Sequence, residues 1–449
     1  YDRAAHHQFA RKLAADGIVL LKNAQNVLPV APTDKLAFIG VMADHPRYQG
    51  AGSSHVTPDH VVSALAAAKS AGLNVTYAPG YSLDVGEIDN DLQTAAVKLA
   101  RKADTVIIFV GYRDRDESEG FDKTSLSLPE NQTALIQALS RAVKKLVVVL
   151  ANGSVVEMPW RNQVTAIVET YLAGEAVGEA TIDILTGAVN PSGRLAETFP
   201  VRLADTPSFG TFDQNNDVEN YHEGLFVGYR YFDLHQQNVA FPFGFGLSYT
   251  TFNYTNLTIH DWESDDLRVT FTIKNTGERA GAEVPQLYLS NLTSTIEKPV
   301  RELRQFDKVF LAPNEEKTVT LTLHSRDFSW YNADQHKWEA DNGDYELTIG
   351  ASSRDLRLTQ RITVDRFEAK PLLVTFDTYL NVLMANETTK NIIMQMFGEQ
   401  LSQYTSQDSA STADTEMLFN TPLRALVAGG FPESVIQSFI DQANAALAQ

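Results

Sequence analysis

The spacing of hydrophobic residues changes along this chain, and that change most constrains what the chain can fold into. In the first half, short apolar runs such as Thr105–Val110 and Leu146–Leu150 alternate with segments of helical period, for example Leu92–Ala103. Buried runs separated by helices of this length indicate βαβ units. This half therefore predicts an α/β sandwich built around a mainly parallel sheet.

The second half follows other patterns. Residues 253–364 alternate apolar with polar side chains between turn signals such as Lys274–Gly277, which predicts about seven short strands in an immunoglobulin-like β-sandwich. Residues 370–449 return to helical spacing around a polar stretch, 402–415, which we expect to be a loop. The expected organisation is an α/β sandwich domain, a Pro-, Gly- and aromatic-rich connector, an all-β domain and a helical C-terminal extension, at residues 1–200, 201–252, 253–366 and 367–449.

Composition excludes several classes of protein. The net charge of −19 argues against a nucleic-acid or anionic-membrane partner, because both are bound through basic patches. The chain has no Cys, so disulfides, Cys–zinc sites and thiol nucleophiles are ruled out. No apolar run reaches the ~18 residues that a membrane-spanning helix needs.

The segment richest in chemistry follows the apolar run Thr105–Val110. Five acids fall within nine positions there, where ligands of open α/β sheets bind beyond the carboxyl ends of strands. A carboxyl among other carboxylates can hold a proton near neutral pH, as a general acid must. A solvated acidic loop is an equal alternative, and a Mg²⁺ or Ca²⁺ site is a lesser one. The five are Asp114, Asp116, Glu117, Glu119 and Asp122.

A second loop, Tyr48–His55, holds Gly50 and Gly52, which permit close backbone approach to a ligand. Ser53, Ser54 and His55 could hydrogen-bond to hydroxyl groups, although a plain turn explains the pattern more simply. His55 stands where a dinucleotide fingerprint has its third Gly, which disfavours a nucleotide-binding protein. No Gly-x-Ser-x-Gly elbow supports a serine hydrolase.

Aromatic residues are concentrated in the connector. They could stack on sugar rings, but in a connector such side chains more often simply pack it down. They are Tyr221, Phe226, Tyr229, Tyr231, Phe232, Phe241, Phe243 and Phe245.

Taken together, these segments resemble glycoside hydrolase family 3, which contains β-glucosidases and β-xylosidases. The likeness covers about residues 8–360, in several long motifs in the right order. The motifs include Ala14–Asn23, the glycine–serine loop, Glu117–Lys123, Asn190–Leu195, Tyr221–Tyr231, Pro242–Tyr249 and, in a fibronectin-III-like domain, Asn275–Gly277 and Lys298–Glu302. Two departures are Lys123, where the family usually has Arg, and Phe245, where it often has His or Tyr.

The resemblance implies a retaining double displacement by two carboxyl groups. In the family the nucleophilic Asp belongs to an N-terminal (β/α)₈ barrel, and nothing in this chain resembles that barrel. We expect the chain to begin just after it. The resemblance assigns the general acid/base to Glu119, with Glu117 as the second choice. It also places Ser53 and Ser54 at the rim of the sugar pocket.

The expected function is therefore part of a retaining β-glucosidase that cleaves terminal β-D-glucosyl residues. Its partners would be a β-glucoside or oligosaccharide and a barrel from the same precursor or another chain, with no cofactor and no metal. The alternatives are a catalytically silent binding or scaffold module and a β-xylosidase. Homo-oligomerisation stays open, and so does localisation, with the bacterial cytoplasm slightly preferred.

Overall fold

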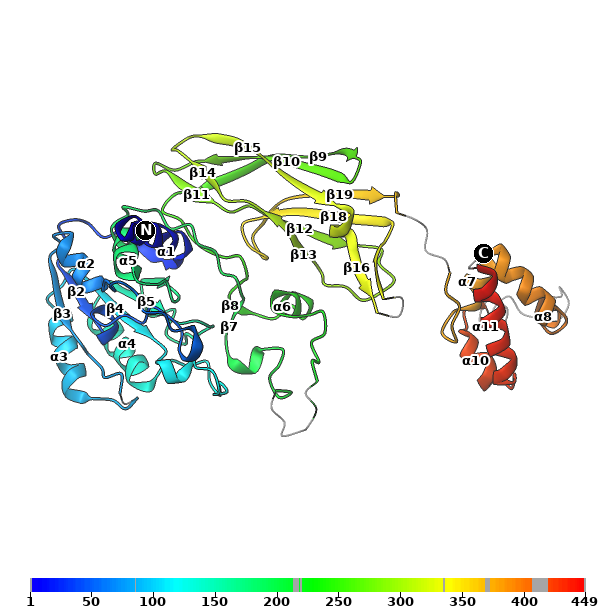
Figure 1. Cartoon of the computed structure of the whole chain (residues 1–449), viewed down its shortest axis with the longest axis horizontal. Helices are drawn as coiled ribbons and strands as arrows, with labels where there is room; N and C mark the ends of the chain where they lie inside the picture. Colours follow the sequence, from blue (N-terminus) through cyan, green and yellow to red (C-terminus); the bar gives the residue numbers. More distant parts are fainter. Residues whose placement is uncertain are drawn as a thin grey trace. The chain divides into compact units, whose positions relative to one another are not determined.

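The computed structural model describes residues 2–84, 86–212, 218, 220–333, 336–367, 372–405 and 419–447. The chain divides into two compact units, Tyr1–Asp365 and Arg366–Gln449. The larger unit contains an α/β layer structure and a β-sandwich, and the smaller unit is helical (Figure 1). None of the helices in the described ranges is long and apolar enough to cross a membrane.

A six-stranded sheet forms the centre of the α/β part. Its neighbouring strands pair in parallel except for the edge strand β1, which is antiparallel to β6. The mainly parallel sheet predicted from the apolar runs is confirmed, and strand β4 is buried along its whole length. In spatial order the strands are β1 (Val19–Asn23), β6 (Ala166–Glu169), β5 (Leu146–Ala151), β4 (Thr105–Gly111), β2 (Leu36–Ile39) and β3 (Val75–Ala78).

Helices cover both faces of this sheet. Helices α3 (Asn90–Ala100) and α4 (Glu130–Ala142) pack on one face, against side chains such as Val106 and Ile108. Helices α1 (Arg3–Gly17), α2 (Ala64–Ser70) and α5 (Val177–Thr186) pack on the other, against the alternate residues such as Ile107 and Phe109. Successive side chains of a strand point to opposite faces, so an uninterrupted apolar run serves both layers.

Helix α1 is attached to the α5 region through a buried histidine. The Nδ1 atom of His7 lies 2.8 Å from a carboxylate oxygen of Glu175, and Nε2 lies 2.5 Å from one of Glu179. Beside it, Arg11 makes two hydrogen bonds of 2.6 Å to Asp183. Helix α1 is therefore held by charged contacts as well as by its apolar residues Ala14 and Ala15.

The strand order reverses direction between β2 and β4. From β2 the chain moves outward to β3, then returns to the other side of β2 to form β4 and continues to β5 and β6. At such a switch point the loops leaving two adjacent parallel strands separate to opposite sides, and the crevice between them is where α/β sheets bind ligands. The glycine–serine loop follows β2, and the acidic loop follows β4.

The connector is less irregular than its composition suggests. It contains the short paired strands β7 (Phe199–Pro200) and β8 (Val239–Phe241), the 3₁₀ turn η5 (Leu203–Asp205) and helix α6 (Tyr229–Leu234). The ring of Tyr229 stacks on Phe243 at 4.7 Å, and its hydroxyl accepts a hydrogen bond from the backbone N–H of Leu303. Much of the aromatic cluster thus packs the connector against its neighbours, whereas Tyr221 is exposed.

Residues 252–364 form the antiparallel β-sandwich region that the alternating pattern predicted. One sheet contains β9 (Phe252–Glu263), β10 (Asp266–Asn275) and β15 (Glu316–His324). The other contains β12 (Gln286–Asn291), β13 (Glu302–Phe306), β18 (Gly343–Gly350) and β19 (Leu356–Val364). Two further pairs are β11 (Gly281–Glu283) with β14 (Val309–Leu311) and β16 (Ser329–Asn332) with β17 (Lys337–Ala340).

A buried ion pair joins the α/β part to the sandwich. Arg194 donates from Nη2 to Glu283 at 2.6 Å, and both side chains are less than a tenth exposed. Nearby, the Asn190 side chain donates to the carbonyl of Ala280, and Gln286 donates to that of Gly244. These polar contacts connect the segment Asn190–Leu195 directly to the sandwich.

The smaller unit consists of helices α7 (Leu380–Ala385), α8 (Glu387–Thr405), α10 (Leu423–Ala428) and α11 (Glu433–Leu447) around its own apolar core. Pro422 occupies the N-cap position of α10. The expected loop 402–415 is wrong at its start, because α8 continues to Thr405. Its remaining residues lie outside the described part of the chain.

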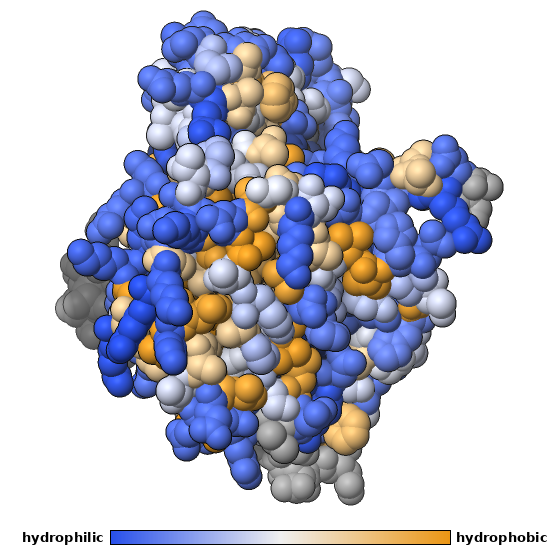
Figure 2. Space-filling view, turned by 90° about the vertical axis from the view of Figure 1, so that its left-hand side faces the viewer, coloured by the Kyte–Doolittle hydropathy of each residue, from blue (hydrophilic) through white to orange (hydrophobic). Residues whose placement is uncertain are grey.

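The surface is not uniformly polar. Figure 2 shows several groups of hydrophobic residues, in orange, among hydrophilic ones on the face that lies at the left of Figure 1. Large exposed apolar side chains of the described residues include Val56 and Phe121, at 67% and 72% exposure, one in each neighbourhood of the two predicted loops.

Candidate active site

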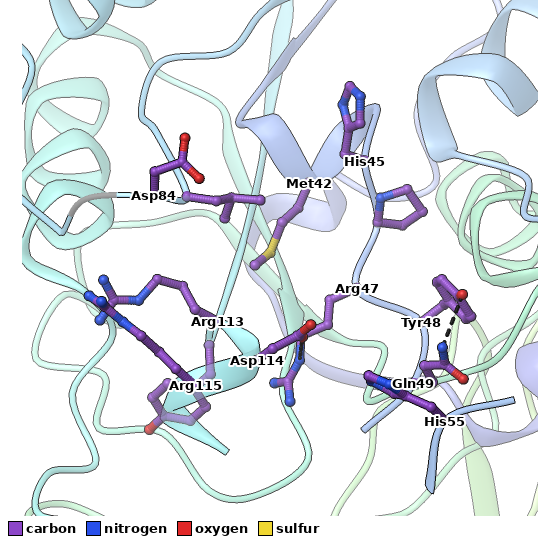
Figure 3. Close-up of a pocket in the computed structure, with 13 residues that line it drawn as sticks. Met42, His45, Arg47, Tyr48, Gln49, His55, Asp84, Arg113, Asp114 and Arg115 are labelled. Atoms are coloured by element: carbon purple, nitrogen blue, oxygen red, sulfur yellow. Dashed lines mark hydrogen bonds and ion pairs between the residues drawn. The ribbon is translucent and has the colours of Figure 1, made fainter. Parts of the chain in front are cut away.

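A pocket of about 530 Å³ opens at the switch point of the sheet (Figure 3). One wall comes from the segment after β2, including Met42, Arg47 and Tyr48, and the other from the segment after β4, including Tyr112 and Arg113. The sequence prediction that the acidic loop lies at a ligand-binding edge agrees with this position. Glu119 itself does not line the pocket, because it lies farther along the same loop.

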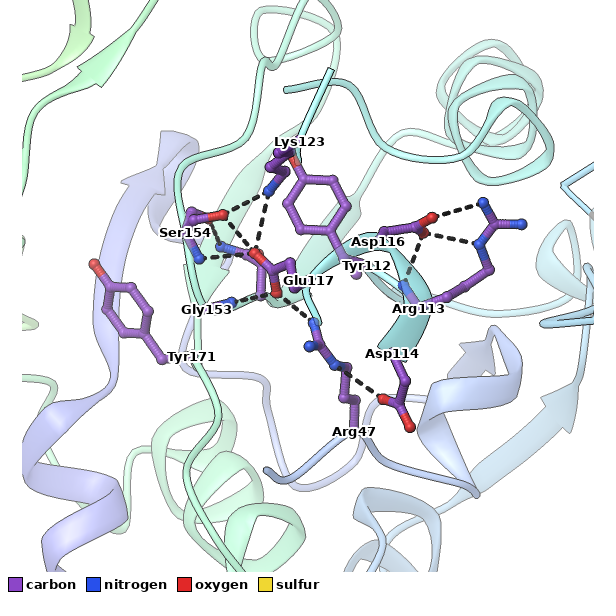
Figure 4. Close-up of polar contacts among 12 residues, drawn as sticks. Arg47, Tyr112, Arg113, Asp114, Asp116, Glu117, Lys123, Gly153, Ser154 and Tyr171 are labelled. Carbon is purple, nitrogen blue, oxygen red and sulfur yellow. Dashed lines mark hydrogen bonds and ion pairs between the residues drawn. The ribbon is translucent and has the colours of Figure 1, made fainter. Parts of the chain in front are cut away.

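Glu117 is held by a dense set of donors (Figure 4). One carboxylate oxygen accepts hydrogen bonds from the Arg47 guanidinium and from the backbone N–H of Gly153, the latter at 2.8 Å. The other accepts from the backbone N–H and hydroxyl of Ser154 and from Lys123 Nζ at 3.1 Å. This single side chain therefore joins the segments that follow β2, β4 and β5.

The environment of Glu117 keeps it ionised. Burial alone would raise its pKa, but the hydrogen bonds from Ser154, Gly153 and Arg47, together with the charge of Lys123, hold the pKa below its ordinary value. A carboxylate in that state does not carry the proton that a general acid must deliver. Glu117 has the contacts of a residue that organises the loop.

Two other acids of the loop are also paired with cations. Asp116 receives two hydrogen bonds of 2.8 Å from Arg113, and Asp114 lies 3.3 Å from Arg47 Nε. The sequence interpretation supposed that neighbouring carboxylates would favour a protonated acid by mutual repulsion. That reasoning is wrong for this loop, because the charges of Asp114, Asp116 and Glu117 are offset by cations of the same chain.

Glu119 differs from these three. It is exposed, and among the residues that the structure describes none forms an ion pair with its carboxylate. It lies against the glycine–serine loop: a Cβ built on Gly52 would stand 2.9 Å from Oε2 of Glu119 and 3.2 Å from its Cβ. Gly52 has φ +78°, a conformation that favours glycine. The two loops found by sequence are thus in contact.

Ser53 and Ser54 lie beside this contact, in the 3₁₀ turn η3 (Gly52–Ser54). Both are exposed. The loop is closed by Gln49, whose side-chain oxygen accepts a hydrogen bond from the backbone N–H of Val56 and whose amide nitrogen donates to Tyr48. The serine hydroxyls and the Glu119 carboxylate therefore belong to one exposed patch at the carboxyl edge of the sheet.

Comparison with known proteins decides the family. Residues 18–249 match the glycosyl hydrolase family 3 C-terminal domain, and residues 283–353 match the fibronectin type III-like domain. The chain belongs to glycoside hydrolase family 3.

Family 3 relatives cover nearly the whole chain. It is 41% identical to thermostable beta-glucosidase B of Acetivibrio thermocellus over 99% of its own length and 60% of that protein. It is 37% identical to an exo-alpha-(1->6)-L-arabinopyranosidase of Bifidobacterium longum over 84% of its length and 51% of that protein. The chain thus spans about half to three fifths of these relatives.

Solved structures of the family share the fold. The crystal structure of the Bifidobacterium adolescentis GH3 beta-glucosidase matches with a TM-score of 0.83 and 37% identity, over 88% of this chain and 58% of that one. The Kluyveromyces marxianus beta-glucosidase in complex with glucose matches with a TM-score of 0.77 and 25% identity, over 81% and 63% of the two chains.

Lys123 is one of the two departures from the family pattern noted in the sequence, and the structure shows which groups its ammonium contacts. Its ammonium group lies 3.1 Å from Glu117, 2.5 Å from the hydroxyl of Ser154 and 3.4 Å from the centre of the Tyr112 ring. A lysine makes these contacts as a point charge rather than as a bidentate fork. Phe245, the other departure, packs against Phe241 at 5.5 Å.

Several residues of this family 3 site escaped the sequence reasoning. Asn152 donates to Glu169 at 2.9 Å, and Glu169 also accepts from the backbone N–H of Tyr171. Glu169 is fully buried, and burial raises its pKa to about 8. Asn152 and Ser154 directly follow the apolar run Leu146–Leu150, so the strand-end rule applied to residues 111–123 would have found them as well.

Proposed function

We propose that this chain is the non-barrel part of a retaining β-glucosidase and that Glu119 is its general acid/base. The observation that carries the proposal is the exposed Glu119 carboxylate resting on Gly52 at the switch point of a family 3 domain. Its neighbour Glu117 is committed to Arg47, Lys123 and Ser154. Glu119 is free to meet a substrate.

The proposed reaction has two steps. A barrel Asp attacks the anomeric carbon while Glu119 gives its proton to the departing glycosidic oxygen, which leaves a glycosyl ester on the Asp. Glu119, now a carboxylate, takes a proton from water as that water attacks the same carbon and releases the Asp. The two carboxyl groups must stand about 5–5.5 Å apart across the bond. The barrel therefore has to cover the loop that carries Glu119.

The surface around Glu119 supports such a cover. Phe121 and Val56 are exposed apolar side chains in the two neighbourhoods concerned, and a covering domain would bury them. Burial also favours the neutral form of a carboxyl group, which is the form that a general acid needs. Ser53 and Ser54 would then lie at the edge of the enclosed space and hydrogen-bond to sugar hydroxyls.

The test uses the 449-residue chain and a chimaera. In the chimaera, the portion of the Acetivibrio thermocellus relative that this chain does not match precedes residue 1. The chain alone should not hydrolyse an aryl β-glucoside, because one of two essential carboxyls is absent. The chimaera should hydrolyse it with retention. Turnover by pure chain, or an inactive but folded chimaera, would contradict the proposal.

Azide rescue identifies the acid/base within the chimaera. Glu119→Ala should lower turnover of substrates with poor leaving groups by about 10²–10⁴-fold. Azide needs no deprotonation, so it should restore turnover of activated aryl glucosides and give a β-glycosyl azide. Glu117→Ala is the comparison variant on the same loop, and its folding must first be verified by circular dichroism because the Glu117 carboxylate pairs with Arg47 and Lys123. Rescue of Glu117→Ala but not Glu119→Ala would move the role to Glu117.

The identity of the sugar that is cleaved must be determined with a panel of substrates. The relatives' names include beta-glucosidase and exo-alpha-(1->6)-L-arabinopyranosidase, so aryl β-D-glucoside, β-D-xyloside and α-L-arabinopyranoside should be compared. We expect the glucoside to give the highest kcat/KM. A preference for either pentoside would keep the mechanism and change the assigned substrate.

A further inference from the structure

A second pocket, of about 380 Å³, lies on the β-sandwich beside the connector. It shares no lining residue with the pocket of Figure 3, and its volume is within the range of about 300–1,000 Å³ typical of small-molecule sites. We call it the sandwich groove. It is lined among others by Arg230, Asn291, Glu302, Arg304, Tyr331 and Trp338.

Two aromatic side chains of the groove are exposed and yet held in place. Tyr331 and Trp338 face each other across the β16–β17 hairpin, with ring centres 5.5 Å apart in an edge-to-face arrangement. They are 48% and 50% exposed. The Arg326 guanidinium lies 3.3 Å from the centre of the Trp338 ring and so covers one face of that ring. Rings that are held by neighbours in this way lose little conformational freedom when a ligand packs on their exposed parts.

A third aromatic side chain is positioned by hydrogen bonding. The indole N–H of Trp330 donates to Asp341 at 3.3 Å, and Lys298 donates to the other oxygen of the same carboxylate at 2.6 Å. The Lys298 side chain is only 12% exposed. The wall that Trp330 and Lys298 form is therefore fixed by an ion pair from the adjacent loop.

The charges of the groove are paired with each other. Arg304 donates to Glu302 at 2.7 Å, and Arg230 lies 3.7 Å from the other oxygen of Glu302. Because the cations of the groove already have carboxylate partners, a charged ligand would add little electrostatic binding energy. The groove does offer carboxylate acceptors and guanidinium donors side by side, and two adjacent hydroxyl groups of a ligand can hydrogen-bond to both at once.

We propose that the sandwich groove binds a neutral oligosaccharide through residues that do not line the pocket of Figure 3. A pyranose ring presents an apolar C–H face and a rim of hydroxyl groups. The face would pack on the exposed part of one of the two rings, Tyr331 or Trp338, and the rim would bond to Glu302, Arg304 and Asn291. The choice of a β-linked gluco-oligosaccharide as the glycan rests on the proposed function. The existence of the groove and of its aromatic pair does not depend on that function.

The test is calorimetric titration of the 449-residue chain with a β-1,4-linked glucose tetrasaccharide. We expect saturable binding, and we expect Trp338→Ala to weaken it about tenfold. Tyr331→Ala is a second variant if Trp338→Ala fails to fold. Phe310→Ala is the matched control, because Phe310 is 61% exposed on β14 and does not line the groove. No saturable binding, or equal weakening by Phe310→Ala, would overturn the proposal.

Two further measurements separate this proposal from the catalytic one. Glu119→Gln should bind the tetrasaccharide with unchanged affinity, since it lies outside the groove. An inactive chimaera that still binds would refute the proposed reaction and leave the groove intact. If the binding that depends on Trp338 disappears in a folded chimaera that carries Glu119→Gln, and the parent chimaera is active, then the barrel covers the groove. In that case the groove proposal is wrong while the reaction stands.

Discussion

Gly52 and Glu119 lie against each other although 67 positions separate them, because their loops leave the adjacent parallel strands β2 and β4. A Cβ on Gly52 would stand 3.2 Å from the Cβ of Glu119, closer than side chains normally pack. The glycine thus has two roles. It supplies a backbone conformation with positive φ, and it leaves the space that the glutamate occupies.

Gly52→Ala should therefore reduce activity more than stability. Gly72 is the matched control: its φ is +72°, and a Cβ there would meet nothing within 4 Å. Both Ala variants should lose about 1 kcal/mol of stability from the strained backbone. In the chimaera only Gly52→Ala should lower kcat, by up to about 10²-fold, because it displaces Glu119. Equal kcat in the two variants would contradict the assigned contact.

Glu117→Gln should destabilise the fold strongly. Its carboxylate pairs with Arg47, whose side chain is 5% exposed, and with Lys123. Removing one partner of a buried pair typically costs about 3–5 kcal/mol, since the other charge is left uncompensated. Glu119→Gln, on the exposed side of the same loop, should change stability by no more than about 0.5 kcal/mol. Urea unfolding measures both, and similar midpoints would count against the distinction.

Glu169 should make the chain less stable as pH rises. Burial raises its pKa from 4.5 to about 8, so between these values the folded state binds a proton that the unfolded state has lost. The stability that this proton contributes is complete below about pH 4.5 and disappears as pH rises through 8. Unfolding free energies measured across this window should converge toward those of Glu169→Gln at low pH and fall below them at high pH.

The attachment of helix α1 through His7 should also weaken as pH rises. Burial lowers its pKa, but hydrogen bonds to Glu179 and Glu175 outweigh this, and the pKa is raised above 6.5. The attachment of α1 is complete below pH 6.5 and is lost as pH rises through the raised value. Hydrogen exchange of α1 amides should accelerate over that range in the parent chain. In His7→Gln it should show no such step beyond the intrinsic pH dependence.

Much of the fold follows from periodicity alone. Runs such as Thr105–Val110 need two apolar faces, and only a sheet covered on both sides provides them. The sequence also identified both loops of the candidate site, the acidic loop because it follows a predicted strand and the glycine–serine loop because its glycines permit close approach to a ligand. It did not predict that β1 pairs antiparallel to β6, since a short apolar run carries no information about direction.

The roles of individual acids could not be derived from spacing. Glu117 and Glu119 are two residues apart in the same acidic run, and only the positions of Arg47, Gly153 and Ser154 distinguish them. Those partners come from two other loops, so their contribution depends on tertiary structure. The domain boundaries and the catalytic assignments stay predictions until they are tested.

The ion pair between Arg194 and Glu283 also bears on where such a chain can be divided into fragments. An expression fragment cut at residue 252 would separate two charges that water scarcely reaches. Each fragment would then expose its charge, and the surface around it, to water. A sandwich exchanged between family members should therefore be moved together with a matching Asn190–Leu195 segment, so that the buried glutamate keeps its arginine partner.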